Sequence, residues 1–172
     1  ADILRLWVAQ SDYTSDLRIG PEILKGVADS YRRLRNSMRF MLGSLEHSHP
    51  VSIDSRIDFP ELEKWVLHRL KQLDISVRKG YKTYAFQTVF QQLFQFCTVD
   101  LSSFYFDIRK DTLYCESMSS PGRKAAILTL NLVFERLVTW FAPILPFTME
   151  EVWLNRFLKE EKSVHLKDFS ET

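Results

Sequence analysis

Residues 21–45 carry apolar side chains at alternating spacings of three and four, and this pattern constrains the fold more than any other feature of the chain. A helix with that spacing has one continuous apolar seam, which packs against helices running nearly parallel or antiparallel to it. Glycine is rare, with five residues among 172, and β-branched alternation is almost absent. We therefore predict an all-α, antiparallel helical bundle. The seam consists of Leu24, Val27, Tyr31, Leu34, Met38, Met41 and Leu45.

Further helices are predicted from the same periodicity and from the prolines that open or end them. One begins near Pro60 and directs an apolar face inward. Residues 83–113 are aromatic and apolar almost all round, so we expect this helix in the middle of the bundle. Another follows the turn cluster at residues 117–123 and ends before Pro143. The inward face of the first of these contains Leu62, Val66, Leu70, Leu73 and Val77.

The start of the last helix is predicted in most detail. Thr148 as the N-cap residue, with Glu151 three residues later, matches a capping box. Phe147 and Val152 have the spacing of a hydrophobic staple across that cap. After this helix, residues 163–166 are predicted to be a short extended piece.

Two segments are predicted to lie outside the packed helices. Residues 2–10 form a short amphipathic lead-in helix that is not part of the bundle core, and a structured connection follows it. Residues 47–60 are polar, contain two prolines and read as an exposed connection. We therefore divide the chain into a lead-in segment, 1–20, and a helical bundle with a short C-terminal tail, 21–172. Without an initiator methionine, the chain is expected to be a fragment of a longer protein.

The sequence excludes several classes of function. It has no glycine-rich phosphate loop, no nucleophile elbow and no HExxH motif, so we predict no catalytic residues. Cys97 and Cys115 stand alone, without the spacing of a zinc site, which predicts structural thiols and no metal ligands. The longest apolar stretches are far shorter than the roughly 20 residues of a membrane span. No secretion signal is present, and we expect a cytoplasmic protein without membrane contact.

Charge placement carries more information than the net charge, which is only +1. Four arginines fall within residues 32–39 and no acid interrupts them. At 100° per residue, Arg32, Asn36 and Arg39 form a stripe opposite the apolar seam. Guanidinium groups bind phosphates and stack on unpaired bases, and an asparagine can read a base edge. The stripe suits RNA, although an ordinary solvated helix face has the same composition.

A second basic ridge follows the next helix, where Lys64, His68, Lys71, Arg78 and Lys82 repeat at similar spacings. Two neighbouring helices with such ridges would form one groove for a polyanion. The sequence does not decide whether the two ridges face the same way. Trp65, beside Lys64, is either a stacking platform for a base or a partly buried packing residue.

Several motifs resemble segments of one family, the isoleucyl-tRNA synthetases, and they occur in the same order as in that family. They are ADILRLWVAQSDYTSDLRIGPEILK, YRRLRNSMRFMLGSL, EKWVLHRLKQL, YAFQTVFQQLFQFCTVDLSSFYFDIRKDTLY, APILPFTMEEVW and SVHL, which together cover essentially the whole chain. APILPFTMEEVW is shared in looser form with valyl and leucyl relatives. LSSFYFDIRKDTLY and DYTSDLRI are closest to the isoleucyl form.

The resemblance implies a bundle that binds the anticodon stem and loop of isoleucine tRNA. Residues 1–20 would be a stem-contact segment that joins it to the catalytic body of the same enzyme. The HIGH and KMSKS signatures and the editing insertion are missing, so this piece is expected to be non-catalytic and without a cofactor. We also expect a monomer. In the full enzyme, the body uses ATP and Mg²⁺, and many bacterial members bind zinc in a C-terminal segment that is not present here.

Family analogy extends the RNA-facing role to the arginine stripe and to Arg18, near the inner bend of the tRNA. The second ridge adds two lysines. The predicted RNA-binding residues are Arg32, Arg35, Asn36, Arg39, Arg18, Lys64 and Lys71. Two alternatives stay open, the same domain of a valyl or leucyl enzyme and a helical interaction scaffold that binds no RNA.

Overall fold

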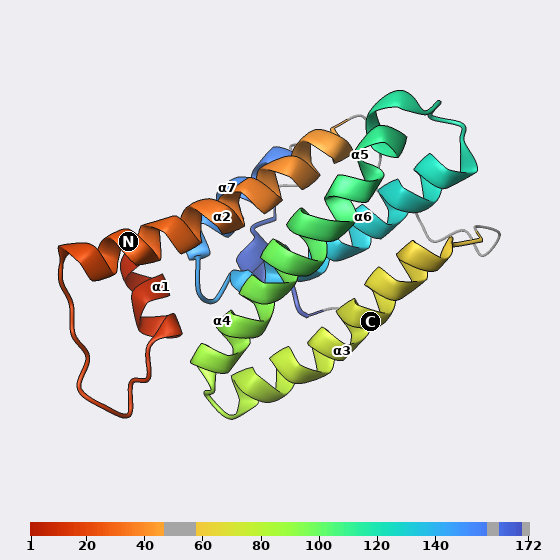
Figure 1. Cartoon of the computed structure of the whole chain (residues 1–172). Helices are drawn as coiled ribbons and strands as arrows, with labels where there is room; N and C mark the ends of the chain where they lie inside the picture. Colours follow the sequence, from red (N-terminus) through yellow and green to blue (C-terminus); the bar gives the residue numbers. More distant parts are fainter. Residues whose placement is uncertain (47–57, 158–161, 170–172) are drawn as a thin grey trace.

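The computed structural model describes residues 1–46, 58–157 and 162–169, and within these ranges every regular element is helical. Successive long helices reverse direction, which confirms the predicted all-α antiparallel bundle (Figure 1). Most of the connection predicted over residues 47–60 falls outside the described residues. The elements are α1 (Asp2–Gln10), α2 (Pro21–Leu45), α3 (Glu61–Lys82), α4 (Phe86–Gln95), the π-helix η1 (Phe96–Tyr105), α5 (Phe106–Cys115), α6 (Pro121–Phe141), α7 (Pro146–Arg156) and the 3₁₀ turn η2 (Val164–Leu166).

The α2 helix has the length and the buried face that its spacing predicts. It begins at Pro21, whose missing N–H costs nothing in the first turn of a helix. Its seam residues from Val27 to Leu45 are buried, except that Tyr31 is half-buried, and they face α1, α6, α7 and η1. The outward side of α2 is therefore left for the arginines.

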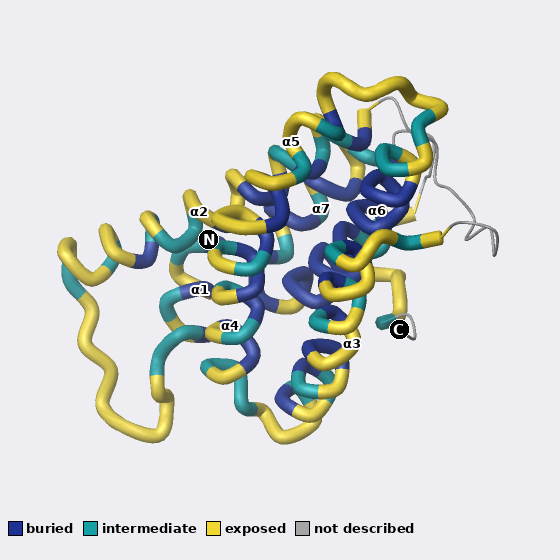
Figure 2. Tube along the Cα trace, turned by 45° about the vertical axis from the view of Figure 1, so that its right-hand side comes forward, coloured by how far each residue is buried: buried dark blue, intermediate teal, exposed yellow. Residues whose placement is uncertain are grey.

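The most buried helix is α6, and the prediction that residues 83–113 occupy the middle of the bundle is wrong. Figure 2 shows α6 buried along most of its length, with α2, α3, α5 and α7 packed around it. In contrast, α4, η1 and α5 form one rod whose outer side exposes Val99, Phe104 and Ile108. The rod carries polar Gln, Ser and Asp residues on that exposed outer side, whereas α6 is buried on nearly every side from Ala125 to Phe141.

A π-helical stretch in the middle of the rod was not predicted. The Ser103 hydroxyl donates to the carbonyl of Thr98, five residues earlier, at 2.8 Å. The widened turn lets the rod approach α2, where the hydroxyls of Ser37 and Ser102 lie 2.8 Å apart. Segments with i→i+5 bonding are rare and occur mostly as short interruptions of α-helices.

A buried ion pair joins α3 to α5. Arg109 donates to both carboxylate oxygens of Glu63, at 2.6 Å each, and Tyr105 donates to one of them at 3.1 Å. Glu63 is fully buried, and its hydrogen bond holds the pKa of the Arg109 guanidinium above the ordinary value. Removing one partner of such a pair leaves an uncompensated buried charge, so the pair fixes how α3 sits on the rod.

The first helix belongs to the core, which corrects the prediction that it is a lead-in outside the bundle. Leu6 and Ala9 of α1 are buried in the main apolar cluster. Arg5 donates to the carbonyl oxygens of Pro143 and Ile144, at 2.8 and 3.2 Å. These carbonyls follow the C-terminal end of α6, where a cation is favoured by the helix dipole. The amphipathic spacing of residues 2–10 therefore marks a packed helix.

The predicted capping box at Thr148 is also wrong. Helix α7 begins at Pro146, so Thr148 lies inside its first turn, and Phe147 is 69% exposed and forms no staple. Both the backbone N–H and the hydroxyl of Thr148 donate to Oδ2 of Asp2, at 2.8 and 2.5 Å. The hydroxyl of Tyr31 lies 2.9 Å from that of Thr148. A carboxylate from another helix thus caps α7, because anionic acceptors are favoured at a helix N-terminus.

The tail forms a turn in place of the predicted extended piece at residues 163–166. The Ser163 hydroxyl accepts the N–H of His165 at 3.1 Å and starts the η2 turn. One carboxylate oxygen of Glu150 on α7 accepts both the Ser163 hydroxyl and the N–H of Val164, at 2.9 Å each. The end of the described chain is therefore held against α7.

Replacing Asp2 with alanine is expected to lower the free energy of unfolding by about 1–3 kcal/mol, because the buried N–H of Thr148 loses its acceptor. Urea unfolding measures this change. Asp16→Ala, at an exposed position in the 11–20 connection, serves as the control and should stay within about 0.5 kcal/mol of the unchanged protein. Equal effects of the two substitutions would contradict the assigned role of Asp2.

The two cysteines should differ sharply in reactivity. Cys97 is buried and Cys115 is exposed, and burial raises the pKa of the Cys97 thiol. The thiolate is the reactive form, so at about pH 8 a thiol reagent should label Cys115 and spare Cys97. Cys115→Ser should therefore leave the folded chain unlabelled until denaturant is added. Rapid labelling of that variant in native buffer would show that the packing around Cys97 is wrong.

Candidate nucleic-acid interface

A surface groove lies between α2 and α7, and we call it the α2–α7 groove. Its volume is about 390 Å³. The groove contains all four residues that were predicted on α2 as RNA contacts, so the structure brings these side chains together. The lining residues are Arg32, Arg35, Asn36, Met38, Arg39 and Leu42 from α2 and Glu151, Val152 and Asn155 from α7.

The groove forms because α2 and α7 run side by side in the same direction (Figure 1). Tyr31 meets Thr148 near the start of α7. About one turn further along α2, Arg35 faces Glu151. Met38 and Val152 are buried between the two helices and form an apolar floor. Cationic side chains thus stand above a surface on which a flat ring can lie.

The arginines of the groove are available to a ligand. Arg32 pairs with Asp29 at 2.6 Å, but the side chains are 69% and 51% exposed. Arg35 lies 3.6 Å from Glu151, with side chains 56% and 60% exposed. Arg39 is exposed and has no ion-pair partner among the described residues. Exposed pairs of this kind contribute only about 0.2–1 kcal/mol, so a phosphate can displace them at little cost.

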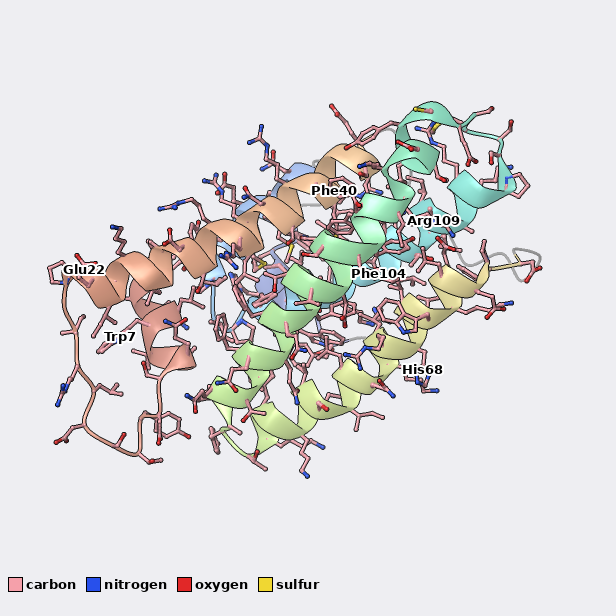
Figure 3. The ribbon with its side chains drawn as sticks, viewed as in Figure 1. Trp7, Glu22, Phe40, His68, Phe104 and Arg109 are labelled. Carbon is pink, nitrogen blue, oxygen red and sulfur yellow. The ribbon has the colours of Figure 1, made fainter. Side chains whose placement is uncertain are left out.

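The basic ridge of α3 does not face the α2–α7 groove. The two basic ridges therefore do not form one shared groove. The rod of α4, η1 and α5 separates α2 from α3 in both views (Figures 1 and 2). Figure 3 shows His68 pointing away from α2, and no residue of α3 lines the α2–α7 groove. Lys64 lies 3.5 Å from Glu61 and 3.6 Å from Asp58. The two helices follow each other in sequence without packing as neighbours.

The other members of that ridge are also placed by the structure. Lys71 is exposed on the same helix. Arg78 donates to Asp74 and to the carbonyl of Phe169, so it holds the tail. Trp65 is 37% exposed, and its ring meets the edge of Phe104, also exposed, at a centroid distance of 5.3 Å, so it packs on the rod while part of the ring stays accessible.

Arg18 does not join the groove. It is exposed in the 11–20 connection, before the N-terminal end of α2. The groove arginines begin about three helical turns further along, at Arg32. Any contact that Arg18 makes with a long ligand is therefore separate from the groove.

Comparison with known proteins decides the family. A family profile described as "Anticodon-binding domain of tRNA ligase" matches residues 63–172. The chain belongs to this family of anticodon-binding domains. The isoleucine-tRNA ligase of Ruegeria pomeroyi is 63% identical over all of the chain, and that of Brucella abortus is 51% identical over all of it. The isoleucine-tRNA ligase of Pelagibacter ubique is 50% identical over 98% of the chain.

The chain spans only 18% of the length of the first two relatives and 19% of the third. These matches include α1 and α2, which precede the region matched by the family profile. The similarity to isoleucine-tRNA ligases therefore extends over both walls of the α2–α7 groove.

The α7 wall of this anticodon-binding domain was missed by the sequence interpretation. Glu151 was assigned to the cap and Asn155 was not considered. The two residues are four apart and so lie on one helix face, and Val152 adjoins them. That spacing was the available signal, but nothing local in the sequence shows that this face meets α2.

Neither a metal site nor a membrane span was found where the structure describes the chain. In these ranges, no three His, Cys, Asp or Glu side chains form a group that could hold a metal ion. None of the helices there combines the length and the apolar character needed to cross a bilayer.

Proposed function

We propose that this anticodon-binding domain belongs to an isoleucine-tRNA ligase and binds the anticodon stem and loop of isoleucine tRNA in the α2–α7 groove. The observation that carries the proposal is the convergence of Arg32, Arg35, Asn36 and Arg39 in one groove with α7. Family membership makes tRNA the polyanion to consider, and identities of 50–63% to isoleucine-tRNA ligases favour isoleucine tRNA over its valine and leucine counterparts.

The groove suits single-stranded RNA. Its volume of about 390 Å³ falls near the lower end of the range of about 300–1,000 Å³ for sites that hold one small ligand, so a single nucleotide can occupy it. Proteins read RNA sequence mostly at unpaired bases, while phosphate contacts fix the position of the strand. The guanidinium groups would hold phosphates, and the apolar floor would take the face of a base.

Residues outside the groove have a smaller part in this proposal. Arg18, beyond the N-terminal end of α2, is proposed to face the inner bend of the tRNA. Lys64 and Lys71 lie on another side of the molecule and would contribute only weak, long-range attraction, which salt screens within about 10 Å.

Catalysis would take place in the remaining four-fifths of such an enzyme, to which this domain would be joined. Activation of isoleucine with ATP and Mg²⁺, and any zinc segment, would belong there. The domain alone would act in the cytoplasm as a monomer that binds RNA without chemical turnover.

Arg39→Ala is expected to weaken binding of isoleucine tRNA and to lower the slope of log Kd against log salt concentration by about 1, for one lost phosphate contact. Fluorescence anisotropy at several salt concentrations measures both quantities. Arg39 is the best position for this test because no ion pair competes for it within the described ranges.

Arg33→Ala and Lys71→Ala are the matched controls, since each removes one exposed cation that does not line the groove. Their slopes should change much less than that of Arg39→Ala. Equal slope changes in all three variants would mean that the tRNA responds to overall charge, and the groove would not be the binding site.

A further inference from the structure

The two walls of the α2–α7 groove differ in hydrogen-bonding character. The α2 wall presents the guanidinium groups of Arg32, Arg35 and Arg39, which only donate hydrogen bonds. The α7 wall presents Glu151, whose carboxylate only accepts them. A groove that bound phosphates alone would be weakened by this acid. The carboxylate therefore favours a ligand that presents a hydrogen-bond donor to the α7 wall.

Glu151 is free to meet such a donor. Its contact with Arg35 is loose, at 3.6 Å, and both side chains are more than half exposed. Asn155, one turn further along, donates its amide nitrogen to the backbone carbonyl of Glu151 at 2.8 Å. That bond uses one N–H of the Asn155 amide and leaves its other N–H and its oxygen available on the same wall. The charged group of the α7 wall, Glu151, is therefore the one that suits a ligand edge with adjacent N–H groups.

A nucleotide fits these walls in one orientation. Its phosphate only accepts hydrogen bonds and belongs against α2, whereas the amino and imino groups of a base belong against α7. Between them, the half-buried Leu42 offers apolar surface to the face of the base, with Met38 and Val152 buried beneath it. The groove can therefore discriminate between bases as well as hold the RNA backbone.

We propose that Glu151 reads the pairing edge of an unpaired guanine, an assignment that rests on the proposed RNA-binding function. Guanine carries an imino N–H and an amino group side by side, so one carboxylate can accept from both, as it does from an arginine fork. Adenine and cytosine place a bare ring nitrogen beside their amino group, and uracil flanks its single N–H with carbonyl oxygens. Those three bases would each oppose the carboxylate with a lone pair.

The neighbouring acid provides a matched control. Glu150 has the same charge and lies on the same helix, but its carboxylate accepts from Ser163 and Val164 in the tail. It does not line the groove. Substitution of either acid by glutamine changes the net charge by the same amount, so a difference between the two variants reports contact with the base.

The experiment measures Kd by anisotropy for RNA hairpins that carry one guanine at each loop position in turn, and for the same hairpins with inosine. Inosine lacks only the amino group. The unchanged chain should bind the best guanine hairpin about 10-fold more tightly than its inosine partner, the lower end of the range for a bidentate base contact. Glu151→Gln should bind that guanine hairpin about 10-fold more weakly and lose the preference over inosine. Glu150→Gln should keep the preference.

Tighter binding of every hairpin by Glu151→Gln would overturn the proposal, because it would show that the acid only repels phosphate. Equal binding of guanine and inosine hairpins by the unchanged chain would overturn it as well. Hairpin binding by Arg39→Ala distinguishes failure of the base-reading proposal from failure of the proposed RNA-binding function. If Arg39→Ala weakens all hairpins while guanine and inosine are bound alike, the groove binds RNA without reading guanine. If Arg39→Ala changes nothing, the proposed binding of RNA in the α2–α7 groove fails, and the base-reading role fails with it.

Discussion

The carboxylate of Asp2 at the N-terminus of α7 is the interaction on which the arrangement of the groove depends. It accepts the backbone N–H and the hydroxyl of Thr148 across 146 residues of sequence. Thr148 in turn meets Tyr31 of α2, one residue before Arg32. Three helices from opposite ends of the chain therefore meet at one buried polar cluster. Because buried polar groups are costly to leave unpaired, this cluster fixes α7 beside α2.

Beyond that contact the two parallel helices border the α2–α7 groove, and the residues that line it decide what it can hold. A net charge of +1 gives the chain little general attraction for RNA. On the proposed function, its affinity would come from the position of the cations, on the side of α2 opposite the buried seam. The ion pairs of Arg32 and Arg35 are weak and exposed, so both side chains can exchange these partners for a ligand.

Local patterns in the sequence predicted local structure well. The seam of α2 and the arginine stripe opposite it follow from helical geometry alone, and both are present. The cap of α7 could not be predicted in the same way, because Thr148 has a good local partner in Glu151, and only the fold brings Asp2 close. Contacts between distant helices also explain the missed α7 wall, because no local pattern shows that α7 meets α2. Sequence order suggested that α2 and α3 were neighbours with a shared basic groove, whereas the rod of α4, η1 and α5 packs between them. The π-helix has no local signature that we could recognise.

Site-specific photocrosslinking tests most directly whether the α2–α7 groove is the RNA-binding surface. A photoreactive amino acid at position 36 would stand in the groove, and one at position 68 would stand on the α3 side, where Figure 3 shows His68. With isoleucine tRNA, we expect crosslinks from position 36 to unpaired nucleotides of the anticodon loop and few from position 68. Efficient crosslinking from position 68, with none from position 36, would contradict the account.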